Sequence, residues 1–363
     1  MRFTEVSDWH DESALLTVPA AAGVFRIDFE NGRPYVGKTA DLRRRLRRLL
    51  VPRDGLSRRL TLRDIARGVH YRATGSPFES SILLYDLARR HLPGDVREHL
   101  KLRPLPFVKI LMGNRFPRTC VTRRLARSRA IFYGPFQTRG AAKQFEDAFL
   151  NLFRVRRCVE NLVPSTSHPG CVWGDMGLCL RPCQQACDDD RYAREVARMA
   201  DFLATDGASF LREVETARDL ASESMEFEAA ARHHRRFVKA RNTLRLRGGL
   251  SRVVGSLCGM VFQRSSEAGS VQATPVYKGS LQAALSLDWD DEPRAALFGA
   301  AIREELASRR WREVTVREKE EHLALLQRWH GSSFRKGEFV PFARMSEAPL
   351  RRLANAAMRV ATG

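Results

Sequence analysis

With 363 residues, the chain is long enough for two or three domains and too long for a single ordinary core. Lysine and arginine total 62 against 42 acidic residues, and this net charge of +20 favours a polyanionic partner, because neutralising phosphates releases counterions. No stretch has the length and apolarity of a membrane span and the first residues lack a signal-peptide pattern, so we expect a cytoplasmic protein without a membrane partner.

Residues 22–50 predict a β-hairpin followed by a helix. Two apolar runs flank Asn31-Gly32, which is a strong signal for a tight hairpin turn. Gly37 and Lys38 close the second run, where a backbone or a phosphate could approach closely. The next stretch, LRRRLRRLL, predicts a helix with a cationic face that consists of Arg43, Arg44, Arg47 and Arg48. This face either contacts DNA or simply faces solvent.

The next segment predicts a short helix between 51 and 68, a strand at 69–73 and then a longer helix. The apolar face of the longer helix carries Ile82, Leu83, Leu87 and Ala88. Glu79 lies in its first turn, where a carboxylate could do no more than complement the helix dipole. The helix is expected to end near Leu92-Pro93.

Several of these motifs together resemble the GIY-YIG nuclease domain of the UvrC/Cho-like excinuclease family. The matching residues are Gly23-Val24-Phe25, Tyr35-Val36-Gly37-Lys38, Leu42-Arg43-Arg44-Arg45-Leu46, Glu79 with Pro93, and further on Phe132-Tyr133-Gly134-Pro135-Phe136 and Leu152-Phe153-Arg154-Val155-Arg156-Arg157-Cys158. The resemblance extends over roughly residues 15 to 245. It implies a DNA repair endonuclease of the nucleotide excision repair type, which makes a single-strand incision near a lesion in duplex DNA.

The resemblance also implies roles for four residues. Glu79 would hold one Mg²⁺ or Mn²⁺, Arg45 would contact the scissile phosphate, and Tyr35 and Lys38 would position or activate the attacking water. These residue types suit the chemistry, since a carboxylate is a hard ligand for Mg²⁺ and a guanidinium matches a phosphate.

Two positions depart from the family pattern. Phe25 stands where the family has a tyrosine, and Leu49 stands where a tyrosine or histidine is common. Neither side chain can give or accept a proton. The alternative is therefore a catalytically weak or inactive DNA-binding or adaptor protein of the same family, and arginine helices do not by themselves distinguish DNA from RNA.

Five of the seven cysteines lie between positions 158 and 187. In a reducing compartment such a group indicates metal or cluster ligation rather than disulfides. Four close thiolates fit a structural Zn²⁺ as well as an iron-sulfur cluster. The resemblance implies a [4Fe-4S] cluster bound by Cys158, Cys171, Cys179 and Cys183, with Cys187 outside the set. Cys120 and Cys258 are expected to be buried strand residues.

Residues 190–245 are nearly all helix formers, interrupted at Gly207, and the simplest interpretation is an ordinary helical subdomain. Residues 225–232, MEFEAAAR, resemble the UVR motif, a helical hairpin that in the family pairs with the equivalent hairpin of UvrB. Phe227 would then be an exposed anchor. His233 and His234 point about 100° apart on a helix, so we treat them as solvated or phosphate-facing.

The C-terminal third predicts a strand hairpin around a turn at 265–269, followed by helices near 293–309 and 315–330. The acidic run Asp288, Asp290, Asp291 and Glu292 is expected to be a solvated loop. Trp329, Phe334 and Phe339 lie among basic residues and could either stack on bases or cap the core.

The chain as a whole is therefore predicted to be an α+β multidomain protein. Its expected units are a small GIY-YIG α/β nuclease-like domain at 1–103, a Cys-rich domain with the cluster or zinc site at 104–189, a helical UVR-like hairpin at 190–245, and a C-terminal α+β domain of unassigned role at 246–363.

Overall fold

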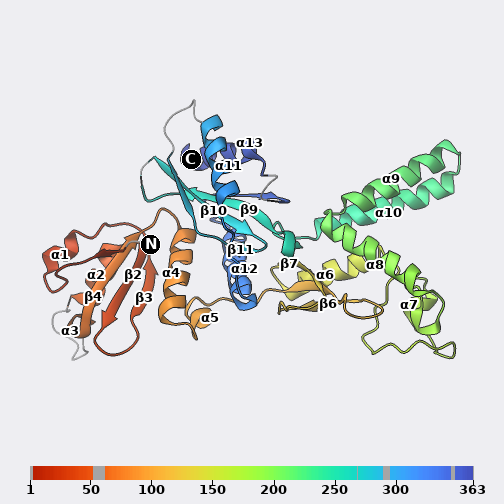
Figure 1. Ribbon diagram of the computed structural model, residues 1–363, viewed down its shortest axis with the longest axis horizontal. Coiled ribbons are helices and arrows are strands. Elements are labelled where there is room, and N and C mark those ends of the chain that lie inside the picture. Colours follow the sequence, from red (N-terminus) through yellow and green to blue (C-terminus); the bar gives the residue numbers. More distant parts are fainter. Residues whose placement is uncertain (1–2, 52–61, 268, 289–294, 345–347, 363) are drawn as a thin grey trace.

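The computed structural model describes residues 3–51, 62–267, 269–288, 295–344 and 348–362. Within these ranges the chain is a mixed α+β protein built on three mainly antiparallel sheets, which agrees with the predicted fold class. Figure 1 shows the N-terminal sheet at one end, the C-terminal sheet above it, and a long helical hairpin projecting from the opposite end. In the described part of the chain, no helix has the length and apolarity needed to cross a membrane.

The N-terminal sheet has the strand order β1-β4-β2-β3. Its strands are β1 (Thr4–Glu5), β2 (Gly23–Phe29), β3 (Tyr35–Thr39) and β4 (Ala66–Ala73). The associated helices are α1 (Glu12–Leu16), α2 (Leu42–Leu50), α3 (Leu62–Ile65), α4 (Pro77–His91) and α5 (Val96–His99). The predicted hairpin is confirmed, as are the three predicted helices, which correspond to α2, α3 and α4, while β4 begins three residues before the predicted strand.

Local signals explain why α2 and α4 form where they do. Asp41 caps α2, since its side chain accepts a hydrogen bond from the Arg44 N–H at 2.9 Å. The buried side chains of α2 recur every four residues, at Leu42, Leu46 and Leu50, which leaves its arginines on the other faces. Ser76 caps α4 in the same way, with a proline at the first helical position.

The middle sheet has the strand order β6-β5-β7-β8. Its strands are β5 (Phe107–Ile110), β6 (Thr119–Thr122), β7 (Ile131–Gly134) and β8 (Arg252–Val253). Helix α6 (Arg139–Leu150) buries Phe145 and Phe149 against this region. The helix ends at Leu150, and Leu152 and Phe153 beyond its end are buried in the same core.

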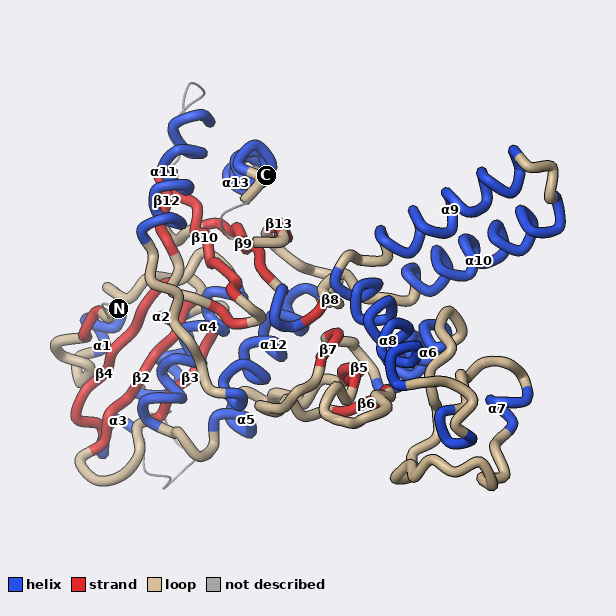
Figure 2. Tube along the Cα trace, turned by 45° about the vertical axis from the view of Figure 1, so that its right-hand side comes forward, coloured by secondary structure: helices blue, strands red, loops and turns tan. Residues whose placement is uncertain are grey.

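The Cys-rich segment after α6 contains little regular structure: α7 (Val172–Asp175) and the 3₁₀ turn η1 (Pro182–Gln184). It leads into α8 (Asp189–Ala204), α9 (Ala208–Glu223) and α10 (Phe227–Arg245), and α9 and α10 form the projecting hairpin (Figures 1 and 2). The predicted break at Gly207 is confirmed. Gly207 has a φ of +83°, and a Cβ there would lie 2.7 Å from Leu244, so no other residue fits easily.

The C-terminal sheet has the order β11-β10-β9-β13, with β12 also paired to β10. Its strands are β9 (Cys258–Arg264), β10 (Ser270–Tyr277), β11 (Ser280–Leu281), β12 (Leu285–Asp288) and β13 (Glu338–Phe342), preceded by η2 (Val254–Ser256). Its helices are α11 (Ala295–Ser308), α12 (Val316–His330) and α13 (Leu350–Thr362). The predicted β9–β10 hairpin and two helices are confirmed, α13 was not predicted, and most of the acidic run falls at 289–294, outside the described residues.

The C-terminal sheet and α12 pack directly onto the N-terminal domain. Phe78 of α4 stacks on Trp329 of α12 with ring centroids 5.0 Å apart. The Tyr85 hydroxyl donates to Glu321 at 3.0 Å, and both residues are buried. One hydrophobic cluster therefore joins α4 to β9, β10 and α12. Of the two roles considered for the C-terminal aromatics, Trp329 caps the core, whereas Phe334 is 92% exposed.

Candidate functional site

Two of the four residues expected at a nuclease site are in direct contact. The Arg45 Nη2 on α2 donates a hydrogen bond to the Tyr35 hydroxyl on β3, with 2.9 Å between the two atoms. Lys38, farther along β3, donates to the Ser81 Oγ on α4 at 2.8 Å. The hairpin and the arginine helix are thus tied to α4, two residues beyond Glu79.

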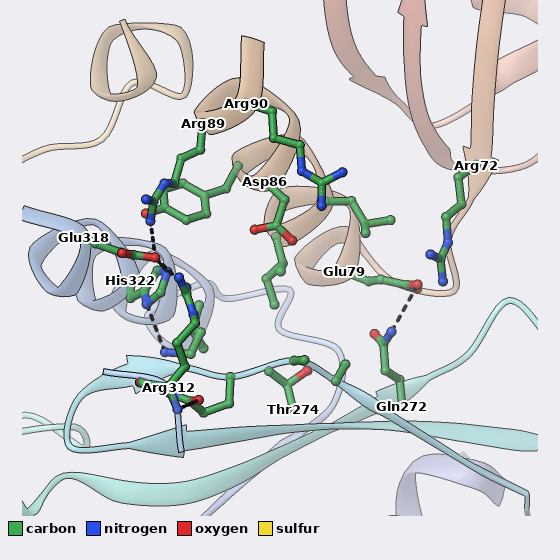
Figure 3. Close-up of a pocket in the computed structure, with 17 residues that line it drawn as sticks. Arg72, Glu79, Asp86, Arg89, Arg90, Gln272, Thr274, Arg312, Glu318 and His322 are labelled. Carbon is green, nitrogen blue, oxygen red and sulfur yellow. Dashed lines mark hydrogen bonds and ion pairs between the residues drawn. The ribbon is translucent and has the colours of Figure 1, made fainter. Parts of the chain in front are cut away.

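Glu79 itself is only 4% exposed, and both of its carboxylate oxygens accept hydrogen bonds from the protein. Oε2 accepts from the Gly75 N–H at 2.8 Å, and Oε1 accepts from the Gln272 Nε2 at 3.2 Å, as Figure 3 shows. Gln272 lies on β10, 193 residues away in the sequence. Burial raises the pKa of Glu79, against the opposing effects of the Gly75 N–H and the Arg72 guanidinium.

The cover over Glu79 is tight. A Cβ on Gly75 would lie 2.2 Å from the Ser265 backbone, so the β9–β10 turn touches the segment that leads into α4. Helix α12 reaches the same region, because Arg328 adds to the effect of burial in lowering the pKa of Lys38. The C-terminal sheet therefore covers Glu79, and α12 approaches Lys38.

The two departures from the family pattern have different surroundings. Phe25 is 1% exposed, and its ring centroid lies 5.7 Å from that of Tyr35. A Cβ on Gly37 would lie 2.8 Å from the Phe25 Cζ, so glycine is needed beside this ring. Leu49 is partly buried against the core of the N-terminal domain. Tyr35 is then the phenol that contacts Arg45.

Two arginines on the cationic face of α2 contact residues of the same domain. The Arg43 Nε donates to the Val18 carbonyl at 2.7 Å, and Arg47 forms an ion pair with Glu12. Arg44 and Arg48 are exposed. All four arginines remain candidates for phosphate contacts, with Arg44 and Arg48 the more accessible pair.

The four cysteines expected to bind a cofactor lie in one loop-rich segment. Cys179 and Cys183 are buried, and the Arg181 N–H points at the Cys179 sulfur at 3.4 Å. Burial raises the pKa of Cys179 to about 11, with smaller contributions from the thiols of Cys158, Cys171 and Cys183. Among the residues that the structure describes, however, no three His, Cys, Asp or Glu side chains are grouped closely enough to hold a metal ion.

The remaining cysteines are as expected except for one. Cys258 is buried in β9, as predicted. Cys120 lies in β6 but is only half-buried, because β6 is an edge strand of the middle sheet. Cys187 is half-buried and packs against the core of the middle domain.

The tip of the α9–α10 hairpin carries exposed apolar side chains. Phe227, the predicted anchor, is 71% exposed, and Met225 and Leu220 beside it are also exposed. His234 is exposed, whereas His233 is half-buried with an Nδ1 that lacks a hydrogen-bond partner among the described residues. The prediction that both histidines are solvated therefore holds for His234 only.

Sequence reasoning missed three groups near Glu79: Gln272, Arg72 and Asp86. Arg72 lies on β4, just ahead of the helix that carries Glu79, and a cation in that place was a signal available in the sequence. Asp86 lies two turns after Glu79 on α4, a spacing that puts both carboxylates on one face. For Gln272 no local pattern could have revealed the contact.

Comparisons with known proteins find similarity to one family. The family model for the UvrC/Cho excinuclease middle domain matches residues 105–202. The chain is 31% identical to UvrABC system protein C of Saccharopolyspora erythraea over 220 residues, which are 60% of this chain and 31% of that protein. It is 25% identical to the protein of the same name from Dehalococcoides mccartyi over 272 residues, 74% of this chain and 45% of that one.

The chain is therefore similar to UvrC-type proteins, and its match to the family model lies in its middle part. No solved structure matches it. The similar segment spans 31 to 45% of the length of these two relatives.

Proposed function

We propose that this chain is a DNA repair endonuclease of the nucleotide excision repair type, with a GIY-YIG nuclease site in its N-terminal domain. The observation that carries the proposal is the linkage of β3, α2 and α4 through the Arg45–Tyr35 and Lys38–Ser81 hydrogen bonds. The first contact pairs a guanidinium with a phenol, and the second joins β3 to the helix that carries the buried Glu79 carboxylate. The UvrC-like sequence supports the substrate class.

Each residue has a defined task in this proposal. Glu79 would bind Mg²⁺ or Mn²⁺ as a single carboxylate ligand, an arrangement that suits Mg²⁺ because this ion keeps several of its waters. When bound, the ion would offset charge on the phosphate. Arg45 would orient the phosphate oxygens and hold the Tyr35 oxygen in place. Lys38, whose pKa burial lowers, would help to position the attacking water.

A condition follows from the cover over Glu79. Gln272 and Gly75 occupy both carboxylate oxygens, so a metal ion competes with the Gln272 hydrogen bond. Loss of the Gln272 hydrogen bond would favour metal binding, and a substrate or partner that weakens this contact would raise activity.

The test is metal-dependent nicking of a lesion-bearing duplex by the purified chain, alone and with a UvrB-type protein. Glu79→Gln keeps the size of the side chain and removes the charge, so it should abolish nicking, and Arg45→Gln should reduce it strongly. Glu98→Gln, at an exposed position on α5, is the matched control. Absence of any nick that depends on both metal and Glu79 would overturn the enzyme proposal.

The second candidate is a non-catalytic DNA-binding or adaptor protein. It is favoured by Phe25, which supplies no hydroxyl, and by the enclosure of Glu79. Binding of duplex DNA that weakens with salt, without nicking under any of the conditions above, would select this function. The two candidates therefore give opposite results in one experiment.

For the Cys-rich unit we propose a [4Fe-4S] cluster, with structural Zn²⁺ as the alternative. The support is the donor set: four thiols lie in a segment with little regular structure of its own, and the other three each influence the pKa of Cys179. A bound cation would stabilise the thiolate forms and hold the loops together. Cys158, Cys171, Cys179 and Cys183 would have to draw closer on binding, because the described residues contain no assembled metal site.

For the hairpin we propose a UVR-like contact with a UvrB-like protein through Phe227. The support is the exposure of its ring at the tip, where a partner hairpin could bury it. Phe227→Ala should weaken capture by a UvrB-type protein at least about tenfold, the usual effect of losing a hot-spot aromatic. Val172→Ala, at an exposed apolar position on α7, is the control.

The proposed division of the chain follows these roles. Residues 1–103 would carry the nuclease site, 104–189 the cofactor and 190–245 the partner contact. Residues 246–363 would cover the nuclease site, since α12 packs on α4 and Gln272 contacts Glu79.

A further inference from the structure

A cavity of about 630 Å³ lies between α4 and the C-terminal sheet. Glu79 and Arg72 line one end of it, and Arg312, Glu318 and His322 line the other. Figure 3 shows α4 above the cavity, with charged side chains pointing in, and β10 below it, with Gln272 and Thr274. Because the cavity begins at Glu79, a ligand in it would lie beside the proposed nuclease site.

The arginines around the cavity fall into two groups. Arg89 and Arg312 both form ion pairs with Glu318, so their charge is largely committed to the protein. Arg72 and Arg90, by contrast, have no ion-pair partner within the described ranges. Figure 3 shows Arg72 beside Glu79 and Arg90 above Asp86, farther along α4. Two guanidinium groups without carboxylate partners are suited to bind a phosphate.

The interior also contains polar groups that the protein leaves without partners. Thr274 is 1% exposed, yet its hydroxyl makes no hydrogen bond to any described residue. Buried hydroxyls are nearly always hydrogen-bonded, and leaving one unpaired costs free energy. The neighbouring Gln282, in contrast, uses both ends of its amide, which bond to Ser280 and to the Arg312 backbone.

Asp86 is the second such group. It lines the cavity from α4, is half-buried, and has no hydrogen bond or ion pair within the described part of the chain. Burial raises its pKa, and the nearby guanidinium groups of Arg90, Arg312 and Arg89 oppose this effect. Asp86 can therefore accept a hydrogen bond from a ligand or donate one to it. The unpaired Thr274 hydroxyl can do the same from the other side of the cavity.

The wall also has an apolar part, besides Tyr85 and Gln272. This part is formed by Ile82, Leu83, Leu281, Ala283 and Ala284. A suitable ligand must then combine an anionic end for the two arginines with a flat, largely apolar body that carries hydrogen-bonding groups on its edge. A nucleotide has this combination, and the volume is sufficient for one.

We propose that this cavity is a nucleotide-binding subsite, in which Arg72 and Arg90 hold a phosphate while Thr274 and Asp86 bond to the edge of the base. The ligand is either a free mononucleotide or one nucleotide of a single strand that continues from Glu79. The strand form rests on the proposed nuclease function, whereas binding in the cavity requires no cleavage. Since α4 and β10 share the ligand, its binding also changes how the C-terminal sheet covers Glu79.

The test measures binding to the full chain by isothermal titration calorimetry in EDTA, so that metal and cleavage play no part. The probes are deoxynucleoside monophosphates, a single-stranded trinucleotide and inorganic phosphate. The variants are Thr274→Val, which removes an unpaired hydroxyl at constant shape, and Arg90→Gln, at an exposed position. Arg123→Gln, an exposed arginine outside the cavity, is the control for charge.

We expect a monophosphate or the trinucleotide to bind, with each of the two variants weakening binding about tenfold and the control leaving it unchanged. Tighter binding of the trinucleotide identifies a strand as the ligand, and tighter binding of the monophosphate identifies a free nucleotide. The proposal is overturned if neither nucleotide probe binds, if phosphate alone binds as tightly as either, or if the two variants behave like the control. A nuclease-inactive protein that still binds nucleotides would refute only the proposed function.

Discussion

The ring of Phe25 is the residue-scale feature that most limits the proposed chemistry. It fills the space left by the missing Cβ of Gly37, and its Cζ is the atom nearest to that space. A tyrosine here would carry its hydroxyl on Cζ, directed toward Gly37 at the edge of the β2–β3 pair. The family pattern has a phenol at this position, and this chain has none.

Phe25→Tyr should raise the rate of metal-dependent nicking by at least about tenfold, since a positioned proton-transfer group contributes roughly 10²–10⁴-fold. The measurement is the single-turnover rate of duplex nicking, with circular dichroism to verify the fold. Phe29→Tyr, on the same strand, is the control for adding a phenol. An unchanged rate for Phe25→Tyr would mean that the missing hydroxyl is not what limits this site.

At the scale of elements, α12 links the C-terminal sheet to the N-terminal domain through a neutral histidine. The Leu281 N–H donates to the His322 Nδ1 at 3.1 Å, and the ring stacks edge-on against Tyr85. Burial lowers the pKa of His322 to about 3 from an ordinary value of 6.5. In the unfolded chain this histidine takes up a proton first, so stability is lost as pH falls from 6.5 toward 3.

His322→Asn keeps an acceptor for the Leu281 N–H but does not titrate. Between pH 7.5 and 5.5 the wild-type free energy of unfolding should fall by about 1.4 kcal/mol more than that of the variant, because one pH unit below 6.5 costs this amount. Urea unfolding at the two pH values measures the difference. Equal losses in the two proteins would show that His322 is not the acid-sensitive group.

The arginine helix α2 is the second element with a testable role. Replacing Arg44 and Arg48 together by glutamine should reduce the slope of log Kd against log salt by about 1.8, or roughly 0.9 for each phosphate that is no longer neutralised. Duplex binding by fluorescence anisotropy at several salt concentrations provides the slope. The matched control replaces Arg123 and Arg124, which are exposed after β6. A slope equal to that of the control pair would mean that α2 only faces solvent.

The sequence predicted those elements whose signals are local. The signals for the β2–β3 hairpin and for α2 lie within a few residues of these elements: they are Asn31-Gly32, the Asp41 cap and the leucines of α2. The signal for the turn between β9 and β10 is local in the same way. Helix α13 was missed because much of its buried face is alanine, at Ala354, Ala356 and Ala357, which gives a weak apolar pattern. The Gln272–Glu79 contact was beyond prediction, since it depends on how two distant parts of the chain pack.

At the scale of the whole molecule, the chain combines an N-terminal domain covered by the C-terminal sheet, a thiol-rich unit and a projecting hairpin. The thiol-rich unit lies between the other two in the sequence, and its loops pack against the core of the middle sheet. A cofactor there would fix the base of the hairpin. The order of these units agrees with a protein that docks through the hairpin and acts through its other end (Figure 1).

Metal analysis of anaerobically purified protein should give close to four iron atoms per chain with a [4Fe-4S] absorption band, or one zinc ion under the alternative. Cys183→Ser should lose the cofactor and Cys187→Ser should keep it, because Cys187 lies outside the proposed ligand set. Wild-type protein with neither metal, or equal losses in the two variants, would contradict the assignment.

The contact between Gln272 and Glu79 is the feature on which the proposed covered nuclease site depends most directly. The decisive measurement is the rate of Mn²⁺-dependent nicking by Gln272→Ala, compared with wild type and with the Gln144→Ala control at an exposed position on α6. Freeing the Glu79 Oε1 should raise the rate severalfold at subsaturating Mn²⁺, since one hydrogen bond of about 1 kcal/mol no longer competes with the metal. Glu79→Gln should abolish this gain. A rate no higher than wild type, or activity that persists without the Glu79 carboxylate, would contradict a covered nuclease site.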